Sequence, residues 1–101
     1  MTDVYASGEW HVRPGQEQEF VRQWHDFATW GQSRYGEGFE RGRLLRDERD
    51  PAHFVSFLEW DDSSAREGWR NDEELMDRVS RLEGLCREVR TGAYEQAAGV
   101  G

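Results

Sequence analysis

The sequence predicts an α+β fold in which a four-stranded antiparallel sheet is covered by helices, with the element order β-α-β-β-α-β. Two observations predict this order: segments of alternating apolar residues, typical of strands, and segments whose apolar residues recur every three or four positions, typical of helices. The length of 101 residues indicates a single domain. We expect this domain to comprise residues 1–101, with a core from 4 to 95 and a frayed tail from 96 to 101.

The first half of the chain contains a predicted strand, helix and strand. Residues 4–12 alternate between two faces and predict the first strand. A Pro-Gly turn at 14–15 precedes a helix from 17 to about 34, whose apolar residues form one stripe. Glycines 36 and 38 end this helix, and residues 38–48 form the second strand.

The second half begins with the strongest strand pattern, residues 53–60, which the turn at Asp50-Pro51 joins to the preceding strand as an antiparallel hairpin. A short helix follows to Trp69, with Ser63 or Ser64 as its N-cap and Glu67 at capping-box distance from Ser64. A longer helix is predicted from about 72 to 85. Residues 86–95 form the last strand.

This order is that of the ferredoxin-like split βαβ arrangement, in which helices cover one face of the sheet. On the third strand, Val55 and Phe57 lie on one face, while Phe54, Leu58 and Trp60 lie on the other. Because both faces of this strand are apolar, we expect the chain to form a homodimer through the sheet faces that the helices leave open.

Charge and cysteine content exclude several classes of partner. The formal net charge of −8 argues against a nucleic-acid partner and against attraction to anionic membranes. No apolar run approaches the roughly 20 residues of a membrane span, and no signal-peptide pattern is present. The single cysteine, Cys86, has no partner for an intramolecular disulfide and no nucleophile motif around it. We therefore expect a cytoplasmic protein with an inert thiol.

Several segments in order resemble one known family. The stretch GFERGRLLRD at 38–47, the Asp50-Pro51 turn and FVSFLEWDD at 54–62 resemble the hairpin of antibiotic biosynthesis monooxygenase domains. The segment RPGQEQEF at 13–20 is similar to the start of that family's first helix, and SAREGW at 64–69 to its short second helix. The resemblance extends from residue 4 to about 95 and rests on the order and spacing of these segments together.

The resemblance implies a dimeric α/β barrel, in which two four-stranded sheets pack face to face. It also implies a cofactor-independent monooxygenase that acts on a small aromatic substrate, polyketide- or quinol-like, whose deprotonated form reduces O₂ directly. Such a site needs an aromatic pocket that excludes water and one or two donors where oxyanion charge develops. The alternative is a non-catalytic small-molecule-binding or accessory dimer of the same fold, because fold does not determine function.

Four residues are candidates for the chemistry. Trp69 corresponds to a Trp that lines the pocket in several relatives, or else it closes the core. Asn71 is a possible donor to a substrate oxygen, or else it caps the next helix. Arg43 could neutralise an enolate, or form a salt bridge like Arg41 on the same face of its strand. His11, at the end of the first strand, is the candidate general base, or else a solvent-facing residue.

Four aromatic residues are candidates for substrate binding. Trp24 is expected on the inner face of the first helix, as pocket wall or as core. Tyr35 and Tyr94 could hydrogen-bond the substrate or serve the fold alone. Phe57 is expected to present its ring from the hairpin.

We expect neither a metal nor another cofactor. His11, His25 and His53 are too scattered for a metal site by sequence spacing. Haem-degrading relatives carry an axial histidine on the second long helix, and residues 72–85 contain none. The glycines between 36 and 42 imitate a dinucleotide motif but precede a strand, so they predict a turn.

Overall fold

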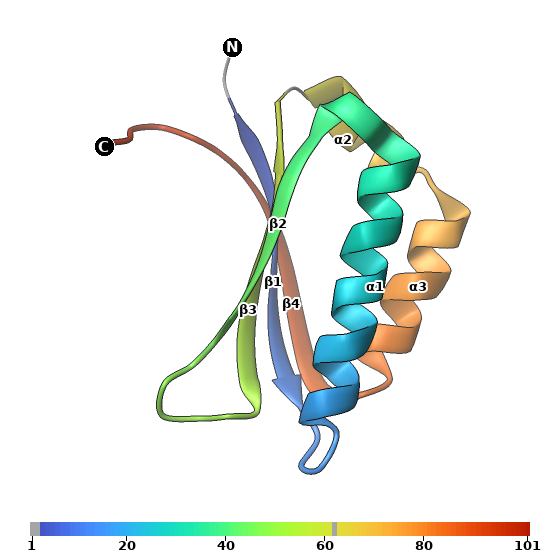
Figure 1. Ribbon diagram of the computed structural model, residues 1–101, viewed down its shortest axis with the longest axis vertical. Helices are drawn as coiled ribbons and strands as arrows, with labels where there is room; N and C mark the ends of the chain where they lie inside the picture. Colours follow the sequence, from blue (N-terminus) through green and yellow to red (C-terminus); the bar gives the residue numbers. More distant parts are fainter. Residues whose placement is uncertain (1–2, 62) are drawn as a thin grey trace.

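The computed structural model describes residues 3–61 and 63–101, without the side chains of residues 37 and 63–66. It confirms the predicted β-α-β-β-α-β order (Figure 1). The elements are β1 (Val4–Val12), α1 (Glu17–Tyr35), a short 3₁₀ turn (Gly36–Gly38), β2 (Phe39–Arg46), β3 (His53–Trp60), α2 (Ser63–Arg70), α3 (Glu73–Glu83) and β4 (Cys86–Glu95).

The four strands form one antiparallel sheet in the order β2-β3-β1-β4. The helices α1 and α3 lie side by side on one face of this sheet, and the opposite face carries no helix (Figure 1). In the central pair, Gly8 lies opposite Ser56 and His11 lies opposite His53. Because side chains alternate along a strand, this register sends Gly8 and Trp10 toward the helices and Glu9 and His11 to the open face.

Glycines and a carboxylate set the limits of the helices. Gly15 has φ of +88° in the turn before α1, and Gly36 has φ of +57° where α1 ends; both values are in the region that favours glycine. Asp72 caps α3, since its carboxylate accepts hydrogen bonds from the backbone N–H groups of Glu74 and Leu75. The prediction that Asn71 caps this helix is therefore wrong by one residue.

The capping box predicted at Ser63 or Ser64 involves side chains outside the described residues.

Two other boundaries differ slightly from the predictions. The second strand ends at Arg46, two residues before the predicted end, because the Asp47 carboxylate accepts backbone hydrogen bonds from Arg49 and Asp50 and turns the chain there. The last helix ends at Glu83, where Gly84 donates its backbone N–H to Ser80.

The core between sheet and helices is dominated by aromatic rings. Trp60, Phe20 and Phe54 are among the largest fully buried side chains. The rings of Trp60 and Trp69 meet edge to face with centroids 4.9 Å apart. Since each aromatic side chain buries about 150–250 Å², a few of them compensate for the small apolar fraction of the sequence.

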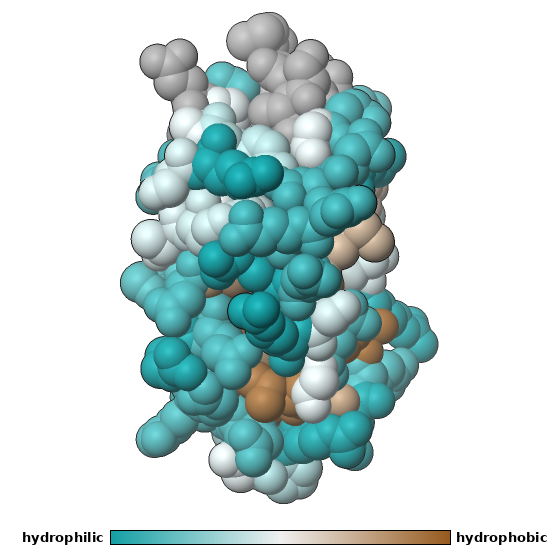
Figure 2. All heavy atoms as spheres, turned by 90° about the vertical axis from the view of Figure 1, so that its right-hand side faces the viewer, coloured by the Kyte–Doolittle hydropathy of each residue, from teal (hydrophilic) through white to brown (hydrophobic). Residues whose placement is uncertain are grey.

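Apolar side chains also occupy the open face of the sheet. Val55 and Phe57 are half-buried there, and Leu45 and Tyr94 are 52% and 61% exposed. The helix side, by contrast, is mostly hydrophilic with small hydrophobic patches (Figure 2). No helix in the described part of the chain is long and apolar enough to cross a membrane.

Candidate active site between the sheet and the helices

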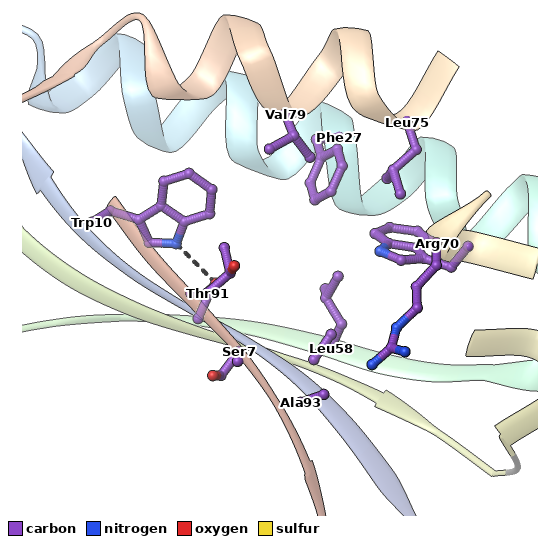
Figure 3. Close-up of a pocket in the computed structure, with 14 residues that line it drawn as sticks. Ser7, Trp10, Phe27, Leu58, Arg70, Leu75, Val79, Thr91 and Ala93 are labelled. Carbon is purple, nitrogen blue, oxygen red and sulfur yellow. Dashed lines mark hydrogen bonds between the residues drawn. The ribbon is translucent and has the colours of Figure 1, made fainter. Parts of the chain in front are cut away.

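A cavity of about 380 Å³ lies between the sheet and the helices (Figure 3). Its volume is in the range of small-molecule sites, about 300–1,000 Å³. The side chains that surround it are mainly apolar and come from both layers: Phe27, Leu58, Trp69, Leu75, Val79 and Ala93. The arrangement can enclose a flat apolar molecule of modest size.

Small residues of β1 and β4 make room for this cavity. Ala6 and Gly8 of β1 lie opposite Ala93 and Thr91 of β4, and all four line the cavity. A Cβ atom on Gly8 would lie 2.5 Å from the indole Nε1 of Trp10, closer than atoms tolerate. Only glycine therefore allows Trp10 to lie flat over β1 at this end of the cavity.

The indole of Trp10 is fixed by a buried hydrogen bond. Its Nε1–H donates to the hydroxyl oxygen of Ser56 on β3 over 3.0 Å. Both residues line the cavity and both are almost completely buried. This bond satisfies the indole donor and leaves the Ser56 hydroxyl with one hydrogen to donate.

Trp69 of α2 lines the cavity and also packs in the core. It is only 7% exposed and contacts the rings of Phe27 and Tyr35, each with centroids 5.4 Å away. Gly31 of α1 permits this position, because a Cβ atom there would lie 2.7 Å from the Trp69 ring. The two expectations for Trp69, pocket wall and core, are therefore compatible.

Arg70 supplies the positive charge of the cavity. It follows Trp69 at the end of α2, and its guanidinium points toward Leu58 (Figure 3). Its side chain is 53% exposed, which places it at the mouth, and its nearest carboxylate is that of Glu67 at 3.7 Å. Among the described lining residues no His, Asp or Glu occurs, so Arg70 is the charged side chain among them, and Glu67 beside it offsets part of its charge.

A polar network that includes Tyr35, which contacts the Trp69 ring, lies next to Trp69. The Tyr35 hydroxyl donates to the Asp72 carboxylate over 2.6 Å, and the Arg34 Nε–H donates to the same oxygen over 2.5 Å. The donated Tyr35 hydrogen bond, opposed in part by desolvation, holds the pKa of Asp72 below its usual value. Burial and the Asp72 charge raise the pKa of Tyr35 to about 12. Tyr35 is therefore a fixed neutral donor within this network.

Asn71 and Trp24 do not line this cavity. The Asn71 side chain is exposed, and its Nδ2–H₂ donates to the backbone oxygen of Glu67 over 3.0 Å. Trp24 is buried on the β2 side of α1, at a separate hollow of about 330 Å³ that also contacts Leu44 and Phe54. Tyr35 reaches the site only through its contact with Trp69.

The other predicted site residues lie on the open face of the sheet. Arg43 and Phe57 are opposite each other on β2 and β3, and Tyr94 is on β4. His11 lies on the same face, with its ring stacked on His53 at a centroid distance of 4.4 Å. The prediction that the histidines are too scattered for a metal site rested on sequence spacing, which does not show that antiparallel pairing brings His11 and His53 together.

Sequence reasoning missed Arg70, Thr91 and the Trp10–Ser56 pair as cavity residues. Arg70 was next to a recognised position, but nothing in its spacing shows that its side chain turns back to the cavity. Thr91 and Ser56 can be recognised as cavity residues only once the strand pairing is known, because each lies opposite Gly8. The clue in the sequence was the run of small residues at alternate positions of the first and last strands.

Comparison with known proteins agrees with this architecture. The crystal structure of SnoaB, a cofactor-independent oxygenase from Streptomyces nogalater, superposes with a TM-score of 0.83 at 21% identity and covers 99% of this chain and 97% of that one. A protein from Pseudomonas aeruginosa gives a TM-score of 0.75 at 20% identity, with 97% of each chain covered. A conserved protein from Methanosarcina mazei Go1 gives a TM-score of 0.77 at 16% identity, with 93% of this chain and 92% of that chain covered.

These three structures are less than 25% identical in sequence to this chain, so their similarity shows a shared fold alone. Among proteins with curated functions, none matches the chain significantly. The family model of antibiotic biosynthesis monooxygenases matches residues 3–78, which is most of the chain and includes β1, the hairpin, α2 and the start of α3. The chain belongs to the antibiotic biosynthesis monooxygenase family.

Proposed function

We propose that the protein is a cofactor-independent monooxygenase that oxidises a small electron-rich aromatic compound in the cavity between sheet and helices. The observation that carries this proposal is the combination of an apolar, aromatic cavity of about 380 Å³ with Arg70 at its mouth, the charged side chain among the described lining residues. Family membership and the fold shared with SnoaB, a cofactor-independent oxygenase, support the same chemistry.

Arg70 has the role that we expected of Asn71 or Arg43. A guanidinium is positively charged and offers several N–H donors, so it can stabilise the oxyanion of a phenolate or enolate. The walls formed by Trp69 and Phe27 contact the faces of the substrate ring, and the Ser56 hydroxyl is a second donor at the other end. In this proposal Trp69 acts as pocket wall.

The proposed reaction needs only substrate and O₂. For an anthrone, the ring CH₂ group, which is conjugated through the aromatic rings with the carbonyl, loses one proton to solvent and becomes an enolate. The enolate carbon transfers its electrons to O₂, a C–O bond forms, and the peroxide takes up one proton. Loss of the remaining C–H hydrogen together with OH⁻ releases water and leaves a new C=O, so that R₂CH₂ and O₂ become R₂CO and H₂O.

One observation favours the alternative of a ligand-binding dimer without catalysis. The described residues around the cavity include no His, Asp or Glu that could remove a substrate proton. Oxygenation would then be confined to substrates acidic enough to ionise in water, such as anthrones and hydroquinones. An accessory protein would bind the same compounds without consuming oxygen.

We also propose that the protein acts as a homodimer through its open sheet face. Val55 and Phe57 are half-buried there although no helix covers them, and Leu45 is 52% exposed. A second copy would cover these side chains with an equivalent apolar surface, as expected for a two-fold interface.

The experiment is oxygen uptake by purified protein in the presence of a chelator, with a panel of anthrones, naphthols and hydroquinones. We expect uptake for one substrate class. Arg70→Gln should lower kcat by about 100- to 1,000-fold, the usual cost of losing one oxyanion donor. Arg49→Gln, in the exposed turn between β2 and β3, is the matched control and should retain the wild-type rate.

A folded Trp69→Phe variant tests the cavity itself. The smaller ring removes one wall and should weaken binding of the active compound, measured by calorimetry. Unchanged affinity and turnover would remove Trp69 from the site. Binding without oxygen uptake across the panel would establish the accessory role, and uptake that is unchanged in Arg70→Gln would contradict the proposed oxyanion site.

A further inference from the structure

A second cluster of reactive side chains lies on the open face of the sheet, across β1 and β3 from the cavity. His11 and His53 are opposite each other in the strand register, and their rings stack at a centroid distance of 4.4 Å with only 5° between the planes. Glu9, on the same face of β1, brings its Oε1 to 3.2 Å from His11 Nε2 and 3.4 Å from His53 Nε2.

These distances fit the coordination sphere of a small transition-metal ion. One ligand atom from each of the three residues lies within 4.8 Å of the other two. Zinc bonds to His nitrogen and carboxylate oxygen are about 2.0–2.2 Å long, so two ligand atoms on a tetrahedral ion are about 3.3–3.5 Å apart. The two distances from Glu9 are already of this size, whereas the nearly parallel imidazoles would have to rotate toward each other for both Nε2 lone pairs to meet at one ion.

The surroundings of His53 indicate which of its nitrogens is free to bind. Its Nδ1 lies 3.6 Å from the Asp47 carboxylate, and Asp47 is itself held by the backbone N–H groups of Arg49 and Asp50. Carboxylates flank both imidazole nitrogens, and a metal on Nε2 would leave the ring proton on Nδ1 beside Asp47. This is the second-shell arrangement that metal-binding histidines usually have.

That assignment leaves the Nε2 lone pair of His53 facing an oxygen of Glu9. His53 Nε2 is buried and forms no hydrogen bond with the described residues, although Glu9 is only 3.4 Å away. When the ring proton is on Nδ1, these two atoms are both acceptors and need a cation between them. A metal ion bound by both atoms would remove this conflict.

We propose that Glu9, His11 and His53 form a binding site for a divalent transition-metal ion, with Asp47 as the residue that orients His53. Two imidazoles and one carboxylate are the protein ligands of many zinc sites and of non-haem Fe(II) sites. In the single chain the ligand side chains are 22–45% exposed, so solvent, or the second copy in the proposed dimer, can supply the remaining ligands. The site is on the opposite face of the sheet from the cavity and is independent of the proposed oxygenase chemistry.

A second acidic group on this face provides a comparison. Asp3, Glu40 and Glu59 also lie close together, but they offer carboxylates alone, and Glu59 is already paired with Arg41 at 3.3 Å. Carboxylate oxygens suit Ca²⁺ and Mg²⁺, whereas imidazoles favour Zn²⁺ and its neighbours. The two groups therefore predict different metal preferences.

Titration calorimetry of chelator-treated protein with Zn²⁺ and with Co²⁺ tests the proposal. We expect one ion per chain, and for Co²⁺ a visible absorption spectrum that reports nitrogen and oxygen ligands. His53→Ala and Glu9→Gln should lose this binding. Asp47→Asn should weaken it by about 10- to 100-fold, as usual for a second-shell partner. His25→Ala, an exposed histidine of α1, and Glu40→Gln are matched controls and should bind as the wild type does.

A measurement on the wild-type protein keeps the test decisive if a variant fails to fold. Addition of Zn²⁺ should shift the imidazole NMR signals of His11 and His53 and leave those of His25 unchanged. Absence of stoichiometric binding, unchanged affinity in a folded His53→Ala variant, or a shift of the His25 signals in place of those of His11 and His53 would overturn the proposal.

Discussion

The indole Nε1–H of Trp10 donates a hydrogen bond of 3.0 Å to the hydroxyl of Ser56, and this bond joins β1 to β3 at one end of the cavity. Ser56 is one of the few buried polar side chains of the protein, with 3% of its surface exposed. The pair therefore combines two tasks, since it satisfies a buried donor and fixes the indole plane against the cavity.

Replacement of this hydroxyl should destabilise the fold. In Ser56→Ala, the Trp10 N–H remains buried without a partner, which costs about 1–3 kcal/mol of the free energy of unfolding. Ser33→Ala, at an exposed position of α1, is the control and should change stability by less than about 0.5 kcal/mol. Urea unfolding measures both values, and equal stability of the two variants would show that the bond contributes nothing.

The contact between Gly31 and Trp69 predicts an unusual response to alanine. Alanine in a helix normally stabilises relative to glycine by about 1 kcal/mol. In Gly31→Ala, however, the new Cβ would lie 2.7 Å from the Trp69 ring, so overpacking should destabilise by about 1–3 kcal/mol and reduce affinity for a cavity ligand. In Gly68→Ala the nearest atom is 3.6 Å away, and this control should be neutral or stabilising. A stabilised Gly31→Ala variant with unchanged ligand affinity would contradict the packing described for Trp69.

Asp72 makes stability depend on pH in the acid range. Its pKa is lowered in the folded state, chiefly by the Tyr35 hydrogen bond, so the carboxylate stabilises the fold above the unfolded pKa of about 4. This contribution is lost as the pH falls through the folded pKa. Asp72→Asn keeps a helix cap but cannot titrate. We expect it to be less stable than the wild type at pH 7, with a difference that shrinks at low pH.

Thermal unfolding between pH 2 and 7 measures this effect. Asp77→Asn, at an exposed position of α3, is the control for the loss of one negative charge. A stability difference between wild type and Asp72→Asn that stayed constant over this range would show that Asp72 does not titrate with folding.

The proposed dimer can be tested with two matched charge insertions. Phe57→Glu places a carboxylate in the apolar centre of the open face and should convert a dimer to a monomer, as measured by light scattering at micromolar concentration. Met76→Glu changes a residue that is 60% exposed on the helix side and should leave the mass unchanged. A wild-type protein of monomeric mass would exclude the dimer.

The fold was predictable because the spacing of apolar residues along the sequence distinguishes strands from helices. The alternation over residues 4–12 and 53–60 and the helical stripe of α1 gave the element limits to within a few residues. The site was less predictable, because it depends on strand pairing. Sequence spacing can find two histidines on one helix, but His11 and His53 meet only through the β1–β3 register. Likewise, Arg43 and Tyr94 are on plausible strands but on the face away from the cavity, as their register shows.

The strand β1 contributes alternate residues to the two faces of the sheet, the cavity side and the open side. Gly8 and Trp10 shape the cavity, while Glu9 and His11 form the cluster on the opposite face. Insertion or deletion of one residue within this strand would exchange the two sets, because each side chain would move to the other face. Homologous chains that keep both groups of residues must therefore also keep the length of this strand segment.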